Sequence, residues 1–308
     1  MTDPRVHPML PFAIFIAILA VSTASIFIRF VQSDGVPSLV IASLRLTFAT
    51  LLLAPIALTK HREEIKRFTR NEILLGGFSG IFLAAHFATW ITSLEYTSVA
   101  SSVVFVSTGP LWVALLSPLL LKEHLAQTAI IGLGLSLAGG TIVGLSDACF
   151  WHGGLSCPAL QNVMQGRAIW GNFLALLGAL TITGYLIIGR KLRSSVSLIP
   201  YIFMVYGIAA IVLTIIMFAS GISPLGYAPN TYGWIFLLAA LPQLIGHSTF
   251  NWVLKYMPAT FVAVTTLGEP IGSATLAFLI LNETPTLAAT MGGVLILTGI
   301  YLASQSSN

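Results

Sequence analysis

The chain contains 308 residues, of which 8% are charged and 56% hydrophobic, and its formal net charge is +4. Soluble globular domains carry roughly 25% charged residues, so this composition excludes an ordinary soluble enzyme and a disordered chain. The basic residues lie in short clusters between apolar runs, which excludes a nucleic-acid binder. The composition therefore indicates an all-α polytopic membrane protein, because backbone groups in lipid must be satisfied within each segment.

Ten apolar segments follow one another along the chain, each near the roughly 20 residues that span a bilayer. Turn residues or charges separate them, such as Ser33-Asp34-Gly35 and the basic run from Lys60 to Arg70. No clear small-residue cleavage site follows the first segment, so we expect it to be a retained helix. The expected spans are residues 9–31, 37–59, 72–94, 98–121, 125–146, 168–190, 198–220, 231–254, 258–281 and 285–304.

The distribution of lysine and arginine predicts the orientation of these spans. With the N-terminus in the cytoplasm, every basic residue except Arg29, Arg45 and Arg167 lies on the inner side. We therefore expect both termini in the cytoplasm and the longest connection outside. That connection contains Cys149 and Cys157, which either form a disulfide or remain two thiols.

The sequence repeats itself at an offset of 160 residues. Residues 94–143 align with residues 254–303 without a gap, and fourteen of the 50 positions are identical. Leucine matches are frequent by chance in apolar sequence, so the matches of other residue types carry more weight. These include Tyr96/Tyr256, Pro110/Pro270, Glu123/Glu283, Gly132/Gly292 and Gly139/Gly299.

The repeated unit contains five helices, an odd number, so the second copy enters the membrane from the opposite side. We predict two inverted five-helix repeats, 1–146 and 168–308, joined by an extracytoplasmic loop over 147–167. Inverted repeats are typical of secondary transporters, which alternate access to a site near the bilayer midplane. The expected bending points are glycines and prolines of the fourth and ninth spans: Gly109, Pro110, Gly268 and Pro270.

The paired motifs resemble the EamA repeat of the drug/metabolite transporter superfamily. The first copy reads Leu94-Glu95-Tyr96 … Gly109-Pro110 … Leu121-Lys122-Glu123 … Gly132 … Gly139, and the second Leu254-Lys255-Tyr256 … Glu269-Pro270 … Asn282-Glu283 … Gly292 … Gly299. Arg45 in the second span and the segment from Gly171 through Tyr185 to Leu192 also resemble the family pattern. The resemblance implies ten helices, a central cavity and export of amino acids, other metabolites or drugs. Within the superfamily, it suggests an aromatic amino-acid exporter of the YddG type.

Two charged residues lie well away from the ends of the predicted spans, where charge is costly and is usually paired or turned toward a cavity. Glu269 lies halfway along the ninth span. It is either a site for a substrate amine or a proton, or a structural group bonded to a neighbouring helix. Arg45 lies in the second span; it either binds a substrate carboxylate, pairs with Glu269, or stabilises helix ends and carbonyl groups.

Polar and aromatic side chains form two stripes at helical spacing in the third and eighth spans. Lipid-facing Gln, His and Asn would be costly, so both stripes should face inward, where they suit a zwitterion with an apolar side chain. Trp90 is alternatively an interfacial anchor, and His86 a packing residue. The predicted substrate-binding residues are His86, Trp90, Tyr185, Gln243, His247, Asn251, Thr265 and Glu269.

The sequence favours a secondary exporter of small metabolites, amino acids including aromatic ones, which works through a central cavity and functions as a monomer in a bacterial inner membrane. One alternative is proton-coupled efflux of drugs or cationic compounds, and another is an intramembrane receptor or enzyme. No Walker A sequence or catalytic motif occurs, so we expect no nucleotide, no cofactor, no metal site and no enzymatic activity. The expected partners are the small-molecule substrate and the lipid bilayer.

Overall fold

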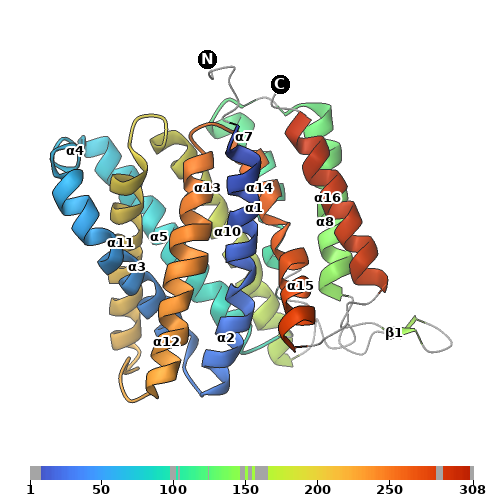
Figure 1. Ribbon diagram of the computed structural model, residues 1–308, viewed down its shortest axis with the longest axis horizontal. Helices are drawn as coiled ribbons and strands as arrows, with labels where there is room; N and C mark the ends of the chain where they lie inside the picture. Colours follow the sequence, from blue (N-terminus) through green and yellow to red (C-terminus); the bar gives the residue numbers. More distant parts are fainter. Residues whose placement is uncertain are drawn as a thin grey trace. The chain divides into compact units, whose positions relative to one another are not determined.

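The computed structural model describes residues 8–97, 102, 105–123, 125–145, 150–151, 155–156, 166–281 and 287–305, and these are helical apart from connections and one short hairpin (Figure 1). The first helices are α1 (Leu10–Ser22), α2 (Ala24–Ser33), α3 (Ser38–Lys60), α4 (Arg62–Lys66), α5 (Arg70–Ser93), α7 (Gly109–Leu120) and α8 (Gln127–Leu145). They are followed by α10 (Gly166–Leu192), α11 (Leu198–Ala219), α12 (Pro229–Leu238), the π-helix η1 (Ala239–His247), α13 (Ser248–Val253), α14 (Ala259–Thr266), α15 (Glu269–Leu281) and α16 (Leu287–Gln305).

Six helical stretches are long and apolar enough to cross a membrane, and they match six of the ten predicted spans. They are Leu10–Ser33, Ser38–Lys60, Arg70–Ser93, Arg167–Leu192, Leu198–Ala219 and Pro229–Val253. The other four predicted spans contain the shorter helices α7, α8, α14 with α15, and α16. Large apolar side chains such as Phe12, Leu74 and Ile215 are exposed on the spans, which suits contact with lipid. The chain is a multi-pass membrane protein.

Several predicted spans are not one uninterrupted α-helix in the described residues. The first breaks at Thr23, whose hydroxyl donates to the carbonyl of Ala20 at 2.8 Å and competes with the backbone ladder. The eighth changes to the π-helix η1, which contains Pro242, a residue without an N–H to donate. The ninth ends as α14 at Thr266 and begins again as α15 at Glu269.

The predicted bending points lie where helices begin. Pro110 and Pro270 are the second residues of α7 and α15, a position where a missing N–H leaves no hydrogen bond unmade. Gly109 begins α7, and Gly268 lies in the break between α14 and α15. Their role as bending points during transport stays a prediction.

The predicted outer loop contains a short hairpin, in which each strand has two residues. The strands β1 (Phe150–Trp151) and β2 (Leu155–Ser156) pair in antiparallel fashion, with Phe150 opposite Ser156. Cys149 and Cys157 lie outside the described residues.

The chain packs as two compact units, and each combines helices from both predicted repeats. Unit 1 comprises residues 1–88 and 184–257, and unit 2 comprises residues 89–183 and 258–308. The boundaries fall within α5 and α10. The predicted division at residues 146 and 168 follows the repeat along the sequence, whereas these units follow the packing.

Helix boundaries repeat at the offset of 160 residues found in the sequence. Helix α3 begins at Ser38 and α11 at Leu198, while α7 begins at Gly109 and α15 at Glu269. The helices α8 and α16 agree at both ends, since 127 and 145 correspond to 287 and 305. The offset therefore extends well beyond the region of aligned identities.

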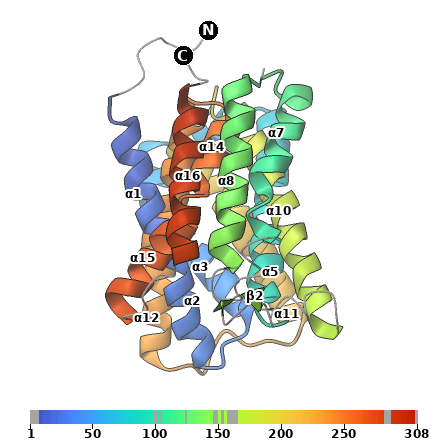
Figure 2. The same cartoon turned by 90° about the vertical axis from the view of Figure 1, so that its right-hand side faces the viewer.

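In unit 2, α8 and α16 lie side by side and antiparallel (Figure 2). A Cβ atom built on Gly132 would lie 2.5 Å from the carbonyl oxygen of Gly299, and one on Gly139 would lie 2.5 Å from that of Gly292. These two contacts exchange under the 160-residue offset. Between them, Ser136 Oγ donates to the carbonyl of its own repeat partner, Ile296, at 3.4 Å. A local two-fold pseudo-symmetry axis therefore passes between α8 and α16.

In unit 1, α3 and α11 form the corresponding antiparallel pair. The hydroxyl groups of Ser43 and Thr214 are 2.9 Å apart, and a Cβ atom on Gly207 would lie 3.5 Å from Thr50 Cγ2. This register places residue 48 opposite residue 209 and residue 49 opposite residue 208, and these two pairings exchange under the 160-residue offset. Both units thus show the inverted relation that the odd number of helices predicts.

Candidate functional site

Arg45 is the centre of a buried polar cluster in unit 1. Its side chain is 1% exposed in the middle of α3. Its Nε donates to Gln243 Oε1 at 3.0 Å, and its Cζ lies 4.3 Å from the centroid of the Phe87 ring. The hydrogen bond and the cation–π contact both stabilise a guanidinium away from water. Both contacts lie within unit 1, whereas a pair with Glu269 would join the two units, and the role of Arg45 stays a prediction.

Gln243 comes from the π-helix η1 and is fully buried. Its oxygen accepts the hydrogen bond from Arg45, which directs the amide nitrogen the other way. That nitrogen is buried without a well-formed hydrogen bond in the described part of the chain, and the Gln243 side chain also interacts with the hydroxyl of Tyr206. A buried donor without a partner requires an explanation, such as a bound water or ligand. π-Helical segments frequently occur at functional sites, and this one carries the unbonded donor.

An aromatic ring, Phe87, lies beside the guanidinium, and two histidine rings pack against it. The Phe87 ring lies 5.0 Å from the His86 ring and 5.6 Å, edge to face, from the His247 ring, centroid to centroid. Thus Arg45, Gln243 and both histidines gather around Phe87, and we call these five residues the Arg45 cluster. Sequence reasoning missed Phe87, because an apolar ring in an apolar helix carries no signal that distinguishes it from packing.

A second hydrogen-bonded group in unit 1 is built around Asn251. Its Nδ2 donates to the carbonyl of His247 at 2.8 Å and to the hydroxyls of Tyr185 and Tyr206 at 2.5 and 3.4 Å. The Tyr206 hydroxyl is also 3.2 Å from Ser248 Oγ. Asn251 Oδ1 is buried without a hydrogen bond among the described residues. Tyr185 and Asn251 were predicted as site residues, and Tyr206 was not.

Two arginines hold the end of α13 and therefore the backbone of Asn251. Arg193 Nε donates to the carbonyl of Asn251 at 3.0 Å, and Arg190 Nη1 donates to that of Leu254 at 2.6 Å. Such contacts satisfy carbonyl groups that a helix C-terminus leaves unbonded. Burial lowers the pKa of Arg193, which lies just beyond the end of α10.

The remaining predicted residues belong to unit 2. Trp90 packs against Gly178, where an added Cβ would lie 3.3 Å from Trp90 Cβ. Thr265 is buried, and its hydroxyl donates to the carbonyl of Val262 at 2.7 Å. Glu269 is half-buried at the start of α15, where the helix dipole favours a carboxylate. The structure thus brings His86, Gln243 and His247 together around Arg45, with Tyr185 and Asn251 in the same unit.

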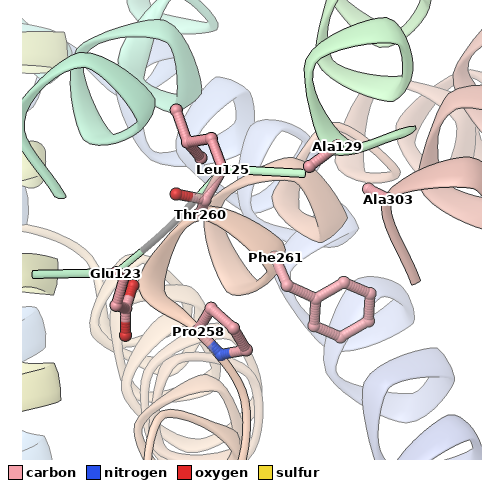
Figure 3. A pocket seen from close by; sticks show the side chains of 7 residues that line it. All are labelled: Glu123, Leu125, Ala129, Pro258, Thr260, Phe261 and Ala303. Carbon is pink, nitrogen blue, oxygen red and sulfur yellow. The ribbon is translucent and has the colours of Figure 1, made fainter. Parts of the chain in front are cut away.

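Unit 2 contains a small cavity at the start of α14 (Figure 3). The Glu123 carboxylate accepts a hydrogen bond from the N–H of Ala259 at 3.1 Å, and Thr260 Oγ1 is buried without a hydrogen bond in the described residues. Pro258 and Phe261 also line the cavity, whose volume of about 30 Å³ suits one water molecule. This volume excludes the cavity as a site for an amino acid. The Glu123/Glu283 identity in the repeat was the sequence signal for the Glu123 contact.

The model of the EamA-like transporter family matches residues 9–145 and 169–305, two regions separated by the same 160 residues. The chain belongs to the EamA-like transporter family. Its resemblance to the drug/metabolite transporter superfamily, first found in the repeat motifs, is thereby confirmed. The family is one of transporters, which agrees with the expectation that the chain is not an enzyme.

Relatives of this EamA-like transporter occur in distant organisms. An "Uncharacterized transporter" from Archaeoglobus fulgidus is 24% identical, with 94% of each chain covered. "Uncharacterized transporter YxxF" from Bacillus subtilis is 21% identical, covering 89% of this chain and 83% of the relative, and a WAT1-related protein from Arabidopsis thaliana is 21% identical over 89% and 81%. A solved crystal structure with a TM-score of 0.76 and 18% identity covers 97% of both chains and shows the same fold.

Proposed function

We propose that this EamA-like transporter exports small metabolites, specifically amino acids including aromatic ones, across a bacterial inner membrane. It would do so by alternating access, as a monomer with ten spans and both termini in the cytoplasm. The observation that carries the substrate class is the Arg45 cluster, in which a cation, an unbonded amide donor and three aromatic rings lie together in unit 1.

The donor side of Gln243 suits a carboxylate. Its amide nitrogen is buried without a well-formed hydrogen bond to the described residues, and the neighbouring guanidinium supplies a favourable positive field. A carboxylate accepts several hydrogen bonds and is attracted by that charge. The Phe87 ring lies beside the guanidinium and packs against the His247 ring, and these rings would contact an aromatic side chain edge-on or in offset stacking.

Gln243 and Asn251 are eight residues apart, and both side chains interact with the hydroxyl of Tyr206. We assign the substrate carboxylate to Gln243, because an amide nitrogen donates hydrogen bonds and a carboxylate accepts them. This assignment makes the carboxylate the feature that the Arg45 cluster selects.

The test is uptake of labelled Trp, Phe and Ala into proteoliposomes, with and without a pH gradient. We expect saturable flux that favours Trp and Phe, with empty liposomes as the control. Absence of amino-acid flux from protein shown to be folded and reconstituted would contradict the proposal.

A second candidate is proton-coupled efflux of drugs or cationic compounds, and the half-buried carboxylate of Glu269 within the ninth span favours it. In that case a lipophilic cation would be accumulated in response to the pH gradient, and labelled Trp would not. The same liposomes distinguish the two candidates when both substrates are measured.

A further inference from the structure

The connection between α3 and α5 carries an unbalanced basic surface next to apolar helix ends. Lys60 ends α3, Arg62 begins α4, Arg67 follows it, and Arg70 begins α5. All four side chains are exposed, and none makes a hydrogen bond or an ion pair with the residues that the structure describes. We call these four residues the basic surface. Figure 1 shows α4 at one end of α3 and α5.

The acidic residues of this connection form no ion pair with the basic surface among the described residues. Glu63 pairs with Lys66 at 2.9 Å. Glu64 accepts the backbone N–H of Ser197 at 2.8 Å, just before α11 begins. Glu72 accepts both the backbone N–H and the hydroxyl of Thr69 at 2.9 Å, as in a capping box. With five cations and three carboxylates, the connection from residue 60 to residue 72 keeps a net charge of +2.

The helix ends beside the basic surface are exposed and apolar. Leu58 at the end of α3 is 53% exposed, and Ile73 and Leu74 near the start of α5 are 52% and 62% exposed. A ligand that suits both features needs an anionic head and apolar chains. Arginine binds phosphate oxygens through paired N–H groups, and juxtamembrane basic clusters of this size bind anionic lipids.

We propose that the basic surface binds an anionic phospholipid, with its phosphate at Arg62, Arg67 and Arg70 and its acyl chains along the exposed ends of α3 and α5. A free phosphate ion would satisfy only the charges. If the positive charges acted only on the orientation of the helices in the membrane, no ligand would need to bind at a defined position. The phospholipid is the occupant that uses both the cations and the adjacent apolar surface.

The experiment measures the affinity of the delipidated full-length protein for phosphatidylglycerol and phosphatidylcholine, by native mass spectrometry from detergent. We expect the triple variant R62Q/R67Q/R70Q to bind phosphatidylglycerol about tenfold more weakly or worse, given the attraction per charge at a membrane surface. Its binding of phosphatidylcholine should not change. The charge-retaining variant R62K/R67K/R70K should keep most of the phosphatidylglycerol binding, which separates lost charge from lost folding.

The matched control removes three exposed positive charges from other connections, as K122Q/K191Q/K255Q. We expect it to bind phosphatidylglycerol like the unchanged protein. An equal loss in both triple variants would show that only net charge matters and would overturn the proposal. Competition by excess inorganic phosphate would also overturn it, because the ligand would then be phosphate and not lipid. None of these measurements depends on the transported substrate.

Discussion

The orientation of one amide decides what the Arg45 cluster can bind. Arg45 fixes the oxygen of Gln243, which leaves the amide nitrogen as a donor toward a ligand. A guanidinium has five N–H groups, so the Nη groups of Arg45 can still donate while Nε is held. Arg45 therefore positions Gln243 through Nε, and the Gln243 amide is a group that we expect to touch the substrate.

Gln243→Glu tests the amide donor while keeping the acceptor that Arg45 uses. We expect at least a tenfold loss of Trp uptake, because a buried donor is replaced by a charge that repels the carboxylate. The control ligand is tryptamine, which lacks the carboxylate: its inhibition of Trp uptake should be weak in the unchanged protein and no weaker in the variant. Unaltered Trp kinetics in a folded variant would remove Gln243 from the site.

Glu269→Gln separates a proton site from a helix-terminal charge. Because Glu269 begins α15, we expect a loss of about 0.3–1 kcal/mol in stability from the missing charge–dipole interaction. Flux, and any response to a pH gradient, should persist. Glu269→Asp, which keeps the carboxylate, is the matched variant. Loss of the gradient response in the glutamine variant alone would favour the proton-coupled candidate instead.

Residue spacing indicated the polar residues of the Arg45 cluster, but not its aromatic residue Phe87. The spacing of Gln243 and His247 in an apolar segment indicated an inward-facing stripe, because exposing them to lipid is costly. Phe87 gave no such signal, since an apolar ring suits lipid, core and ligand alike. The hydrogen bond between Arg45 and Gln243 joins residues 198 positions apart. Helical spacing relates only residues within one helix, so it could not predict this contact.

At the scale of the elements, glycine sets how closely α8 and α16 approach. An added Cβ at Gly139 would meet backbone atoms, the Gly292 oxygen at 2.5 Å and the Ile296 nitrogen at 2.9 Å. Backbone cannot move aside as a flexible side chain can. Gly134 on the same helix has no heavy atom within 4 Å of an added Cβ, so the two glycines form a natural comparison.

Gly139→Ala should destabilise the protein by about 1–3 kcal/mol, the usual cost of overpacking. Gly134→Ala should leave stability unchanged or raise it by up to about 1 kcal/mol, because alanine favours helix more than glycine does. Thermal unfolding of both variants in the same detergent measures the difference. Equal midpoints would mean that α8 and α16 do not pack through this contact.

Hydropathy predicted where most elements lie but not where they break. An average over twenty residues is insensitive to a single lost hydrogen bond, so hydropathy indicated neither the π-helix η1 nor the gap between α14 and α15. Gly268 and Pro270, named as bending points, lie at this gap, and Pro242 lies in η1. None of these residues specifies by itself whether a helix bends, widens or restarts, because the neighbouring helices decide which carbonyl groups find partners.

At the scale of the whole molecule, the repeat is the feature that sequence predicted best. Ser136 of α8 contacts its repeat partner Ile296 of α16, as an inverted repeat requires. The family model matches the chain twice at the same offset. The composition of the two compact units was not predictable in this way. A repeat in the sequence indicates that the two copies have equivalent structures. It does not indicate which helices pack together, because a helix of one copy can pack with the first or with the second copy.

The antiparallel register of α3 and α11 predicts on which side of the membrane each end of this helix pair lies. Lys60 and Ser220 are repeat partners, and because Ser43 meets Thr214 and Thr50 meets Gly207, they lie at opposite ends of this helix pair. If the pair spans the bilayer, single cysteines at the two positions face opposite sides. With Cys149 and Cys157 replaced by serine, an impermeant maleimide should label Ser220→Cys in intact cells and Lys60→Cys only after permeabilisation. Labelling of both from outside would contradict the inverted architecture, whereas the reverse pattern would keep it and overturn only the orientation that lysine and arginine predict.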